Sequence, residues 1–200
     1  MENKTFKSSN PFITLTLEIS KLNEILRRGY EERGVPHEFC ESQSDYLYST
    51  TMLAWTTAEN NPDLQHLSFY KIIKYALISV IGRVTYHLDK EPFQGQRTLE
   101  QQQKERNAVV RLFAGLANQQ EYIALYDSFW KKEDEESRFV HDVRKLQMRI
   151  MAANYYCSGY TKCMEFLDEP YESAFEELNK IADTLINVDF KNFSEAQIQN

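Results

Sequence analysis

The 200-residue sequence is poor in the residues that interrupt helices, since it contains only 6 Gly and 5 Pro. With so few turn formers, a fold built from β-hairpins is disfavoured and helices are expected to dominate. Cysteine is also scarce, and Cys40, Cys157 and Cys163 show no CxxC spacing. This odd set favours neither a disulfide framework nor a zinc site. We therefore expect reduced thiols and a cytoplasmic protein.

Two further absences limit the class of protein. No apolar run approaches the roughly 20 residues that span a bilayer, and the polar residues 1–10 lack the apolar core of a signal peptide. Basic residues are outnumbered, with 23 Lys and Arg against 30 Asp and Glu and a formal net charge of −7. This balance opposes non-specific binding to nucleic acid, which depends on Lys and Arg contacts with phosphates. We expect neither a membrane nor a nucleic-acid partner.

Aromatic residues, in contrast, are abundant. The chain has 12 Tyr, 12 Phe and 2 Trp, and such side chains need a packed interior. A hydrophobic content of 42% and a charged content of 26% are ordinary for a globular protein. The length suits one domain with a substantial core. We expect a single all-α domain over residues 1–187, followed by a polar C-terminal tail over residues 188–200.

Apolar periodicity predicts about seven helices. The first begins at Pro11, after the capping residue Asn10, and its apolar stripe continues to Leu26. The fourth begins at Thr98, which forms a capping-box pattern with Gln101, and ends near residue 118. The other five are expected over about residues 44–58, 68–86, 120–132, 137–157 and 170–185. The helix over residues 68–86 is apolar around most of its circumference, which indicates a central position.

The helix over residues 137–157 contains a His-Asp dipeptide that a motif scan would select as a metal site. Its apolar stripe consists of Phe139, Val143, Leu146 and Ile150. On this helical wheel His141 points nearly opposite the stripe, and Arg144 lies at the edge of the stripe. His141 and Asp142 are therefore predicted to be a solvent-exposed pair. A separate aromatic group is expected to form core or interface rather than a stacking platform; it comprises Tyr122, Tyr126, Phe129 and Trp130.

Four segments carry a family pattern: Arg27-Arg-Gly-Tyr30, Glu41-Ser-Gln-Ser-Asp-Tyr46, Ala76-Leu-Ile-Ser-Val80 and Phe139-Val-His-Asp-Val-Arg-Lys-Leu-Gln147. In this order and at these separations they resemble the HD-domain metal-dependent phosphohydrolases, most closely the 5′-deoxynucleotidase branch. The resemblance covers roughly residues 15–160. It implies an HD-domain helical bundle, a homodimer and a divalent metal held by side chains from separate helices.

The same resemblance places the metal ligands at Tyr46, Ser79, Val80 and Arg144, where the family has a His, a His-Asp pair and an Asp. We refer to these four positions as the metal slot. None of the four residues is a good ligand, because Val has no donor, Ser and neutral Tyr bind poorly, and Arg carries a permanent positive charge. The family's helper Glu falls at Arg83. We therefore expect a degenerate member with no metal, no cofactor and no catalytic residue at this slot.

Arginines at or near the slot suggest a different ligand. Arg27, Arg83 and Arg144 are candidate anion-binding residues, because a guanidinium binds phosphate or carboxylate through two parallel hydrogen bonds. A nucleotide or phosphate would then be the ligand. In the alternative interpretation, Arg83 and Arg144 pair with acidic side chains and plug the cavity. The sequence leaves both interpretations open.

Three functions remain. The chain is either a catalytically inactive pseudoenzyme that binds an anionic ligand or a protein partner, or an active phosphohydrolase whose metal site has moved, or a structural subunit of a larger complex. For a relocated metal, His87 and Asp89 are the best candidate pair, but no further ligands lie near them in the sequence. Metal content, hydrolysis of nucleoside monophosphates and mass in solution distinguish the three.

Overall fold

The computed structural model describes residues 8–86 and 97–186, and it builds this part of the chain from helices. Within these residues the extended pairing is limited to one isolated bridge, between Leu26 and Ser42. The all-α prediction is confirmed, although these residues form nine α-helices rather than about seven. They are α1 (Pro11–Ser20), α2 (Arg28–Glu31), α3 (Gln43–Asn60), α4 (Phe69–Ile78), α5 (Leu99–Leu112), α6 (Gln119–Lys131), α7 (Glu135–Cys157), α8 (Glu165–Asp168) and α9 (Glu176–Ile186). The predicted polar tail over residues 188–200 lies outside the described residues.

The four-residue helices α2 and α8 were not predicted, and short 3-10 helices also lie between the α-helices. They are η1 (Lys21–Asn23), η2 (His37–Phe39), η3 (Pro62–Leu64), η4 (Ile81–Tyr86) and η5 (Thr161–Met164). The first predicted helix therefore ends at Ser20 and continues as η1, which buries Leu22 completely. Leu26 lies beyond it, in the bridge with Ser42. The capping box that starts α5 is confirmed, because Thr98 accepts from the Gln101 amide and Gln101 accepts from the Thr98 amide.

The helix predicted over residues 68–86 is broken near its middle. Helix α4 ends at Ile78, and the Ser79 hydroxyl donates to the Ala76 carbonyl oxygen at 2.8 Å. The chain then tightens into η4, where Gly82 approaches α5. A Cβ atom at position 82 would lie 2.9 Å from both the Cβ atom and the backbone oxygen of Glu105. The absence of a side chain at Gly82 thus allows η4 and α5 to pack closely, and this tertiary contact overrides the apolar periodicity.

Two other predicted helices are shorter than expected. Helix α5 ends at Leu112 rather than near residue 118, and the chain turns at Gly115, which has a φ of +83°. The last predicted helix, over residues 170–185, starts only at Glu176. Before it, buried Arg149 donates hydrogen bonds to the carbonyl oxygens of Phe166, Leu167 and Glu169. These bonds hold the segment after α8 against α7 in a non-helical conformation.

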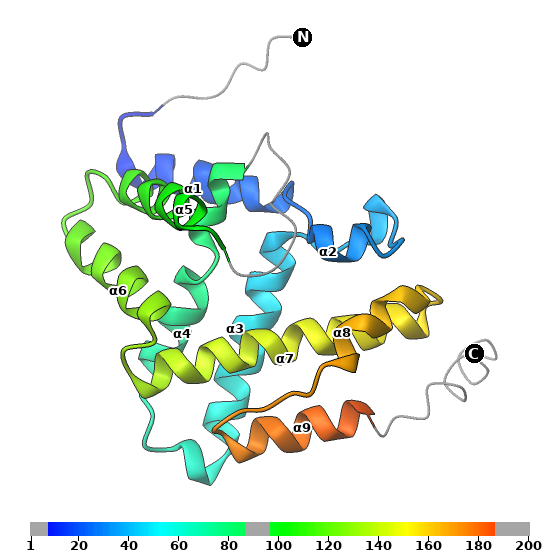
Figure 1. Cartoon of the computed structure of the whole chain (residues 1–200). Helices are drawn as coiled ribbons and strands as arrows, with labels where there is room; N and C mark the ends of the chain where they lie inside the picture. Colours follow the sequence, from blue (N-terminus) through cyan, green and yellow to red (C-terminus); the bar gives the residue numbers. More distant parts are fainter. Residues whose placement is uncertain (1–7, 87–96, 187–200) are drawn as a thin grey trace.

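Helices α3 and α7 cross near the middle of the molecule, and the other helices pack around this crossing (Figure 1). Helix α4 packs against both α3 and α7, and α9 covers another side of α7. The main core lies between these helices, with Ile72, Phe139 and Leu146 completely buried. In the part of the chain that is described, none of the helices has the length and apolar character needed to cross a membrane.

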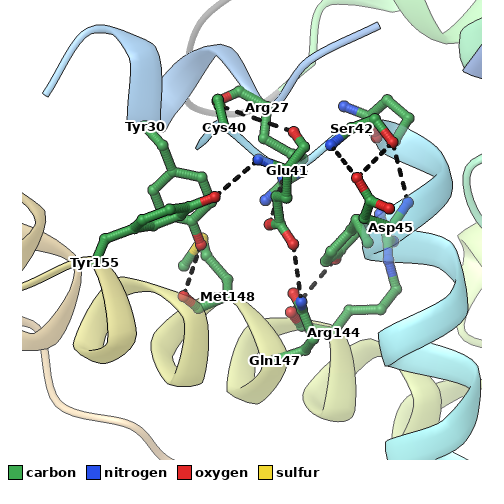
Figure 2. Close-up of polar contacts among 12 residues, drawn as sticks. Arg27, Tyr30, Cys40, Glu41, Ser42, Asp45, Arg144, Gln147, Met148 and Tyr155 are labelled. Atoms are coloured by element: carbon green, nitrogen blue, oxygen red, sulfur yellow. Dashed lines mark hydrogen bonds and ion pairs between the residues drawn. The ribbon is translucent and has the colours of Figure 1, made fainter. Parts of the chain in front are cut away.

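A second, smaller core lies beside the C-terminal half of α7. Tyr30 and Tyr155 form its centre, with ring centroids 4.9 Å apart. The Tyr30 hydroxyl donates to the Met148 carbonyl oxygen at 2.7 Å, and the Tyr155 hydroxyl accepts from the Glu41 amide at 2.8 Å (Figure 2). These two bonds fix the segment that leads into α3 against α7, and so they position the residues at the start of α3.

Candidate functional site

The four residues of the metal slot all lie in the interior. Tyr46 belongs to α3, Ser79 and Val80 follow α4, and Arg144 belongs to α7. Each side chain is at least nine-tenths buried. The Tyr46 hydroxyl donates to the Arg144 backbone oxygen at 3.3 Å, so two slot residues that are 98 positions apart are in direct contact.

The chemistry of these side chains does not fit a divalent metal. The Ser79 hydroxyl donates to the Ala76 carbonyl oxygen of α4, and the Tyr46 hydroxyl donates to the Arg144 carbonyl oxygen. Val80 has no side-chain atom that could bind a metal. The slot also contains the Arg144 guanidinium, whose charge opposes a cation. A group of three or more His, Cys, Asp or Glu side chains with metal-binding geometry is absent from residues 8–86 and 97–186. The proposed relocated pair, His87 and Asp89, lies outside the described residues.

Arginine and aromatic side chains alternate through the slot. The guanidinium carbon of Arg27 lies 4.0 Å from the centre of the Tyr46 ring, and that of Arg144 lies 5.7 Å from the same ring. Arg144 also lies 5.0 Å from the centre of Trp130, and Arg97 lies 3.2 Å from it. We call these five residues the arginine–aromatic series. Cation–π contacts of this kind each contribute about 0.5–2 kcal/mol, and the contribution is larger where water is excluded.

One end of the series is neutralised by a buried carboxylate. Arg27 Nε lies 3.5 Å from Oε1 of Glu41, and the Glu41 side chain is 4% exposed. The other oxygen, Oε2, accepts a hydrogen bond from Gln147 Nε2 at 3.1 Å (Figure 2). Burial raises the pKa of Glu41, while the positive charge of Arg27 opposes this shift. Arg27, a predicted anion-binding residue, therefore holds a protein carboxylate.

The other end is neutralised in the same way. Arg97 forms an ion pair with Glu105, which is buried on α5. The hydroxyls of Tyr86 and Tyr126 donate to the same carboxylate at 3.4 and 3.5 Å. Burial raises the pKa of Tyr86 to about 12, and the negative charge of Glu105 adds to this effect. The two tyrosine hydroxyls therefore remain proton donors to Glu105 at neutral pH.

Arg83, the second predicted anion-binding residue, is bonded within the protein. Its Nη1 donates to Oε1 of Gln43 at 2.7 Å, and Gln43 is completely buried at the start of α3. This bond joins η4 to α3 across the slot. The structure thus brings all three predicted arginines to one region, but it gives Arg27 and Arg83 protein acceptors.

Arg144 differs from the other two. It is 8% exposed and forms no ion pair with a carboxylate of the described residues. Burial lowers the pKa of its guanidinium, and the positive charges of Arg83 and Arg97 lower it further. Its surroundings are the rings of Tyr46, Phe129 and Trp130, at 5.7, 5.5 and 5.0 Å. The plug interpretation required an acidic partner for Arg144, and among the described residues this partner is absent.

The prediction for His141 was wrong. Its ring is partly buried and stacks on Phe129, with centroids 4.2 Å apart and planes 4° apart. Nε2 lies 2.9 Å from the Phe129 carbonyl oxygen, which can only accept, so Nε2 carries the proton. Burial and the neighbouring charge of Arg144 lower the pKa of His141 to about 3. Helix α6 packs over this side of α7, so the face of α7 opposite the apolar stripe is not exposed to solvent there.

Sequence reasoning missed two members of the series, Arg97 and Trp130. The aromatic group was expected to form core, and Phe129 and Tyr126 are indeed buried there, but Trp130 contacts two guanidinium groups. Arg97 lies 33 positions before Trp130. No local periodicity connects the two positions. A count of arginines near aromatic residues would have been the only available signal.

Comparisons with known structures agree with this fold. A conserved hypothetical protein from Pyrococcus furiosus is 27% identical with a TM-score of 0.71, covering 87% of this chain and 98% of its own. A predicted metal-dependent phosphohydrolase from Magnetospirillum magnetotacticum is 20% identical with a TM-score of 0.65, and the match covers 88% of this chain and 89% of that protein. A protein from Pyrococcus horikoshii is 19% identical with a TM-score of 0.62, and the match covers 92% of this chain and 98% of that protein. The last two show the fold alone.

No curated protein matches the chain. The family model of the HD domain, however, matches residues 19–185, which is most of the sequence. The match spans every residue of the metal slot and every residue of the arginine–aromatic series. The chain therefore belongs to the HD-domain family.

Proposed function

We propose that this protein is a catalytically inactive HD-domain protein of the 5′-deoxynucleotidase-like branch that acts by binding an anionic ligand. The observation that carries the proposal is the environment of Arg144, a buried guanidinium without a carboxylate partner among the described residues. An unpaired buried charge destabilises a fold by several kcal/mol in rough terms. Such a charge is retained at a functional site when a ligand supplies the opposite charge.

The proposal of inactivity rests on the side chains that occupy the slot. When bound, the family's metal supplies a hydroxide and polarises the phosphate ester. Here the hydroxyls of Tyr46 and Ser79 donate hydrogen bonds to backbone carbonyl oxygens, and Arg144 places a permanent positive charge in the slot. The arginine charges replace the positive charge of a metal, but they generate no hydroxide at neutral pH. Binding without hydrolysis is the function that this residue set supports best.

Metal analysis tests the first half of the proposal. Full-length protein purified without a His tag should contain well under one equivalent of Mn, Co, Fe, Ni or Zn. A stoichiometric metal would overturn the proposal. The variant His87→Ala then locates it, since loss of metal in this variant would assign the relocated site.

Hydrolysis assays test the second half. We expect no release of phosphate from deoxynucleoside monophosphates above the background rate when Co, Mn or Mg is added. Saturable release that survives repurification, and that depends on the added metal, would show an active phosphohydrolase.

The mass of the protein in solution tests the homodimer that the family resemblance implies. A stable complex with other proteins, together with absence of any response to anions, would favour the structural-subunit alternative.

A further inference from the structure

Helices α3 and α4 carry large apolar side chains that face solvent. On α3, Tyr48 is 69% exposed and Trp55 is 37% exposed. On α4, Tyr70 is 72% exposed and Leu77 is 48% exposed. In each helix the two residues are seven positions apart, and residues at this spacing lie on the same face two turns apart. Each helix therefore presents an apolar stripe to solvent.

The two stripes lie on the same side of the α3–α4 pair. Helices α3 and α4 pack side by side, and both pack against α7 (Figure 1). On α3, Tyr46 points toward α7, because its hydroxyl bonds to a backbone oxygen of that helix, and Trp55 lies roughly 180° around α3 from it. On α4, Tyr75 bonds to the N-cap residue of α7, and Leu77 lies roughly 160° around α4 from it. Both stripes point away from α7, and we call the surface that they form the outer face.

The outer face carries little charge, although the chain as a whole is acidic. Residues 46–58 of α3 contain no charged side chain, whereas the formal net charge of the chain is −7. On α4, Lys71 pairs with Asp134 on the side of α7, and Lys74 lies over Tyr70 with its Nζ 4.7 Å from the ring centre. The centres of protein–protein interfaces are depleted in charged residues and enriched in Tyr and Trp. The outer face has this composition.

The distribution of charge favours a second copy of the same chain as the partner. Two copies that each carry a charge of −7 repel each other, so an uncharged face opposes their association least. In a two-fold contact both copies use the same face, so a charged residue near the axis would meet its own like charge. Aromatic and aliphatic side chains meet their own kind without this penalty. A strongly basic partner would instead be attracted to the acidic residues elsewhere on the chain.

The size of the outer face suits a reversible dimer. Helix α3 has 18 residues and α4 has 10. Their lengths of about 27 and 15 Å, at a width of about 10 Å each, give a projected area of roughly 400 Å² for each copy. The accessible surface of protruding side chains exceeds this projection. Two such faces therefore lie near the lower limit of specific interfaces, which is about 1,200 Å² in total, and we expect a dissociation constant in the micromolar range.

We propose that the outer face joins two copies of this chain in a two-fold dimer, in which the α3–α4 pairs of the two copies pack on each other as four helices. The contact lies on the side of α3 opposite Tyr46, so it leaves the metal slot of each copy undisturbed. The inference goes beyond the proposed function and does not rest on it, because the contact requires neither anion binding nor catalysis.

Sedimentation velocity of the full chain tests the dimer. Between about 1 and 200 μM, a range that spans micromolar affinity, the mass should rise from the monomer mass of 23.6 kDa to twice that value. Tyr48→Glu and Leu77→Glu each place a charge inside the contact, one from each helix, and should raise the dissociation constant by at least about tenfold. Phe12→Glu is the matched control. Phe12 is equally exposed, at 68%, but it lies on α1, which packs against α5, and this variant should dimerise as the parent does.

Hydroxyl-radical footprinting of the parent chain shows which surface becomes buried. Oxidation of Tyr48, Trp55 and Tyr70 should fall as the concentration rises through the range in which the dimer forms. Oxidation of Phe12 and Phe39, which are 68% and 64% exposed outside the outer face, should stay constant. This measurement needs no substitution, so it decides the question even if a variant does not fold.

A chain that stays monomeric over the whole concentration range overturns the inference. It is also overturned if both glutamate variants dimerise like the parent, or if Phe12→Glu dissociates the dimer instead. The two proposals fail separately. A monomeric protein that contains no metal and responds to anions defeats only this inference, whereas a dimer with stoichiometric metal and hydrolysis defeats only the proposed function.

Discussion

Replacing Arg144 by Met should stabilise the protein in the absence of anions. Met fills a similar volume, forms helices as readily as Arg, and keeps apolar contact with the three surrounding rings. The substitution removes a buried charge that lacks a carboxylate partner among the described residues. It also removes the cation–π contacts with Tyr46, Phe129 and Trp130. The sign of the effect depends on which of these two contributions is larger.

The magnitudes favour stabilisation. Burial of an ion costs several kcal/mol as a rough figure, whereas cation–π contacts recover about 0.5–2 kcal/mol each in favourable cases. Arg144 lies 5.0–5.7 Å from all three ring centres, which is the weaker part of the usual range. We expect the free energy of unfolding to rise by about 1–4 kcal/mol, as for other buried ionic groups replaced by apolar ones. For a chain of this size, each 1 kcal/mol raises the melting temperature by about 2–4 °C.

Arg149→Met is the matched control. Arg149 is also buried on α7, at 3% exposed, but its guanidinium donates to three carbonyl oxygens. Its loss strands these acceptors and should destabilise by roughly 3 kcal/mol or more. Both variants are unfolded with urea in a buffer free of phosphate and sulfate. If Arg144→Met loses as much stability as Arg149→Met, the guanidinium has a compensating partner, and the reasoning about an uncompensated charge is refuted.

Three further predictions follow from single side chains. His141→Gln should flatten the pH dependence of stability, because burial lowers the pKa of His141 in the folded protein to about 3. The parent should therefore lose up to about 1.4 kcal/mol of unfolding free energy for each pH unit below the ordinary pKa of histidine. Urea unfolding between pH 5 and 7 measures this loss, and the same dependence of unfolding free energy on pH in parent and variant would contradict it. Gly82→Ala should destabilise by about 1–3 kcal/mol because the added Cβ meets Glu105 at 2.9 Å; an unchanged melting temperature would show that η4 moves freely. Of the three thiols, Cys157 should react with a thiol reagent first in the native protein, because Cys40 and Cys163 are buried and burial raises their pKa values; equal rates for all three would refute this order.

The sequence by itself determined the helical class and the position of the principal helices. Apolar stripes and caps placed the helices that became α3, α6 and α7, each within two residues of its observed ends. The capping box at Thr98 and Gln101 was also correct. These features depend on backbone hydrogen bonds and on neighbours within one or two turns. Local sequence contains that information.

The breaks in the predicted helices needed the tertiary structure. The apolar run over residues 68–86 fits one long helix, yet the close contact of Gly82 with Glu105 on α5 imposes η4 instead. Arg149 in the same way holds the carbonyls after α8 and delays the start of α9 until Glu176. In both cases a contact between distant segments outweighs local propensity.

The candidate site shows the same division. The sequence alone predicted that the side chains of the metal slot fit a metal poorly. It did not predict which side chains surround the slot. Tyr46 contacts Arg144 across 98 positions, and Trp130 contacts Arg144 and His141 only because α6 packs on α7. Whether a guanidinium is paired depends on which side chains the packing brings within a few ångströms of it. That lateral arrangement is fixed by the assembled core and not by the periodicity of any one helix.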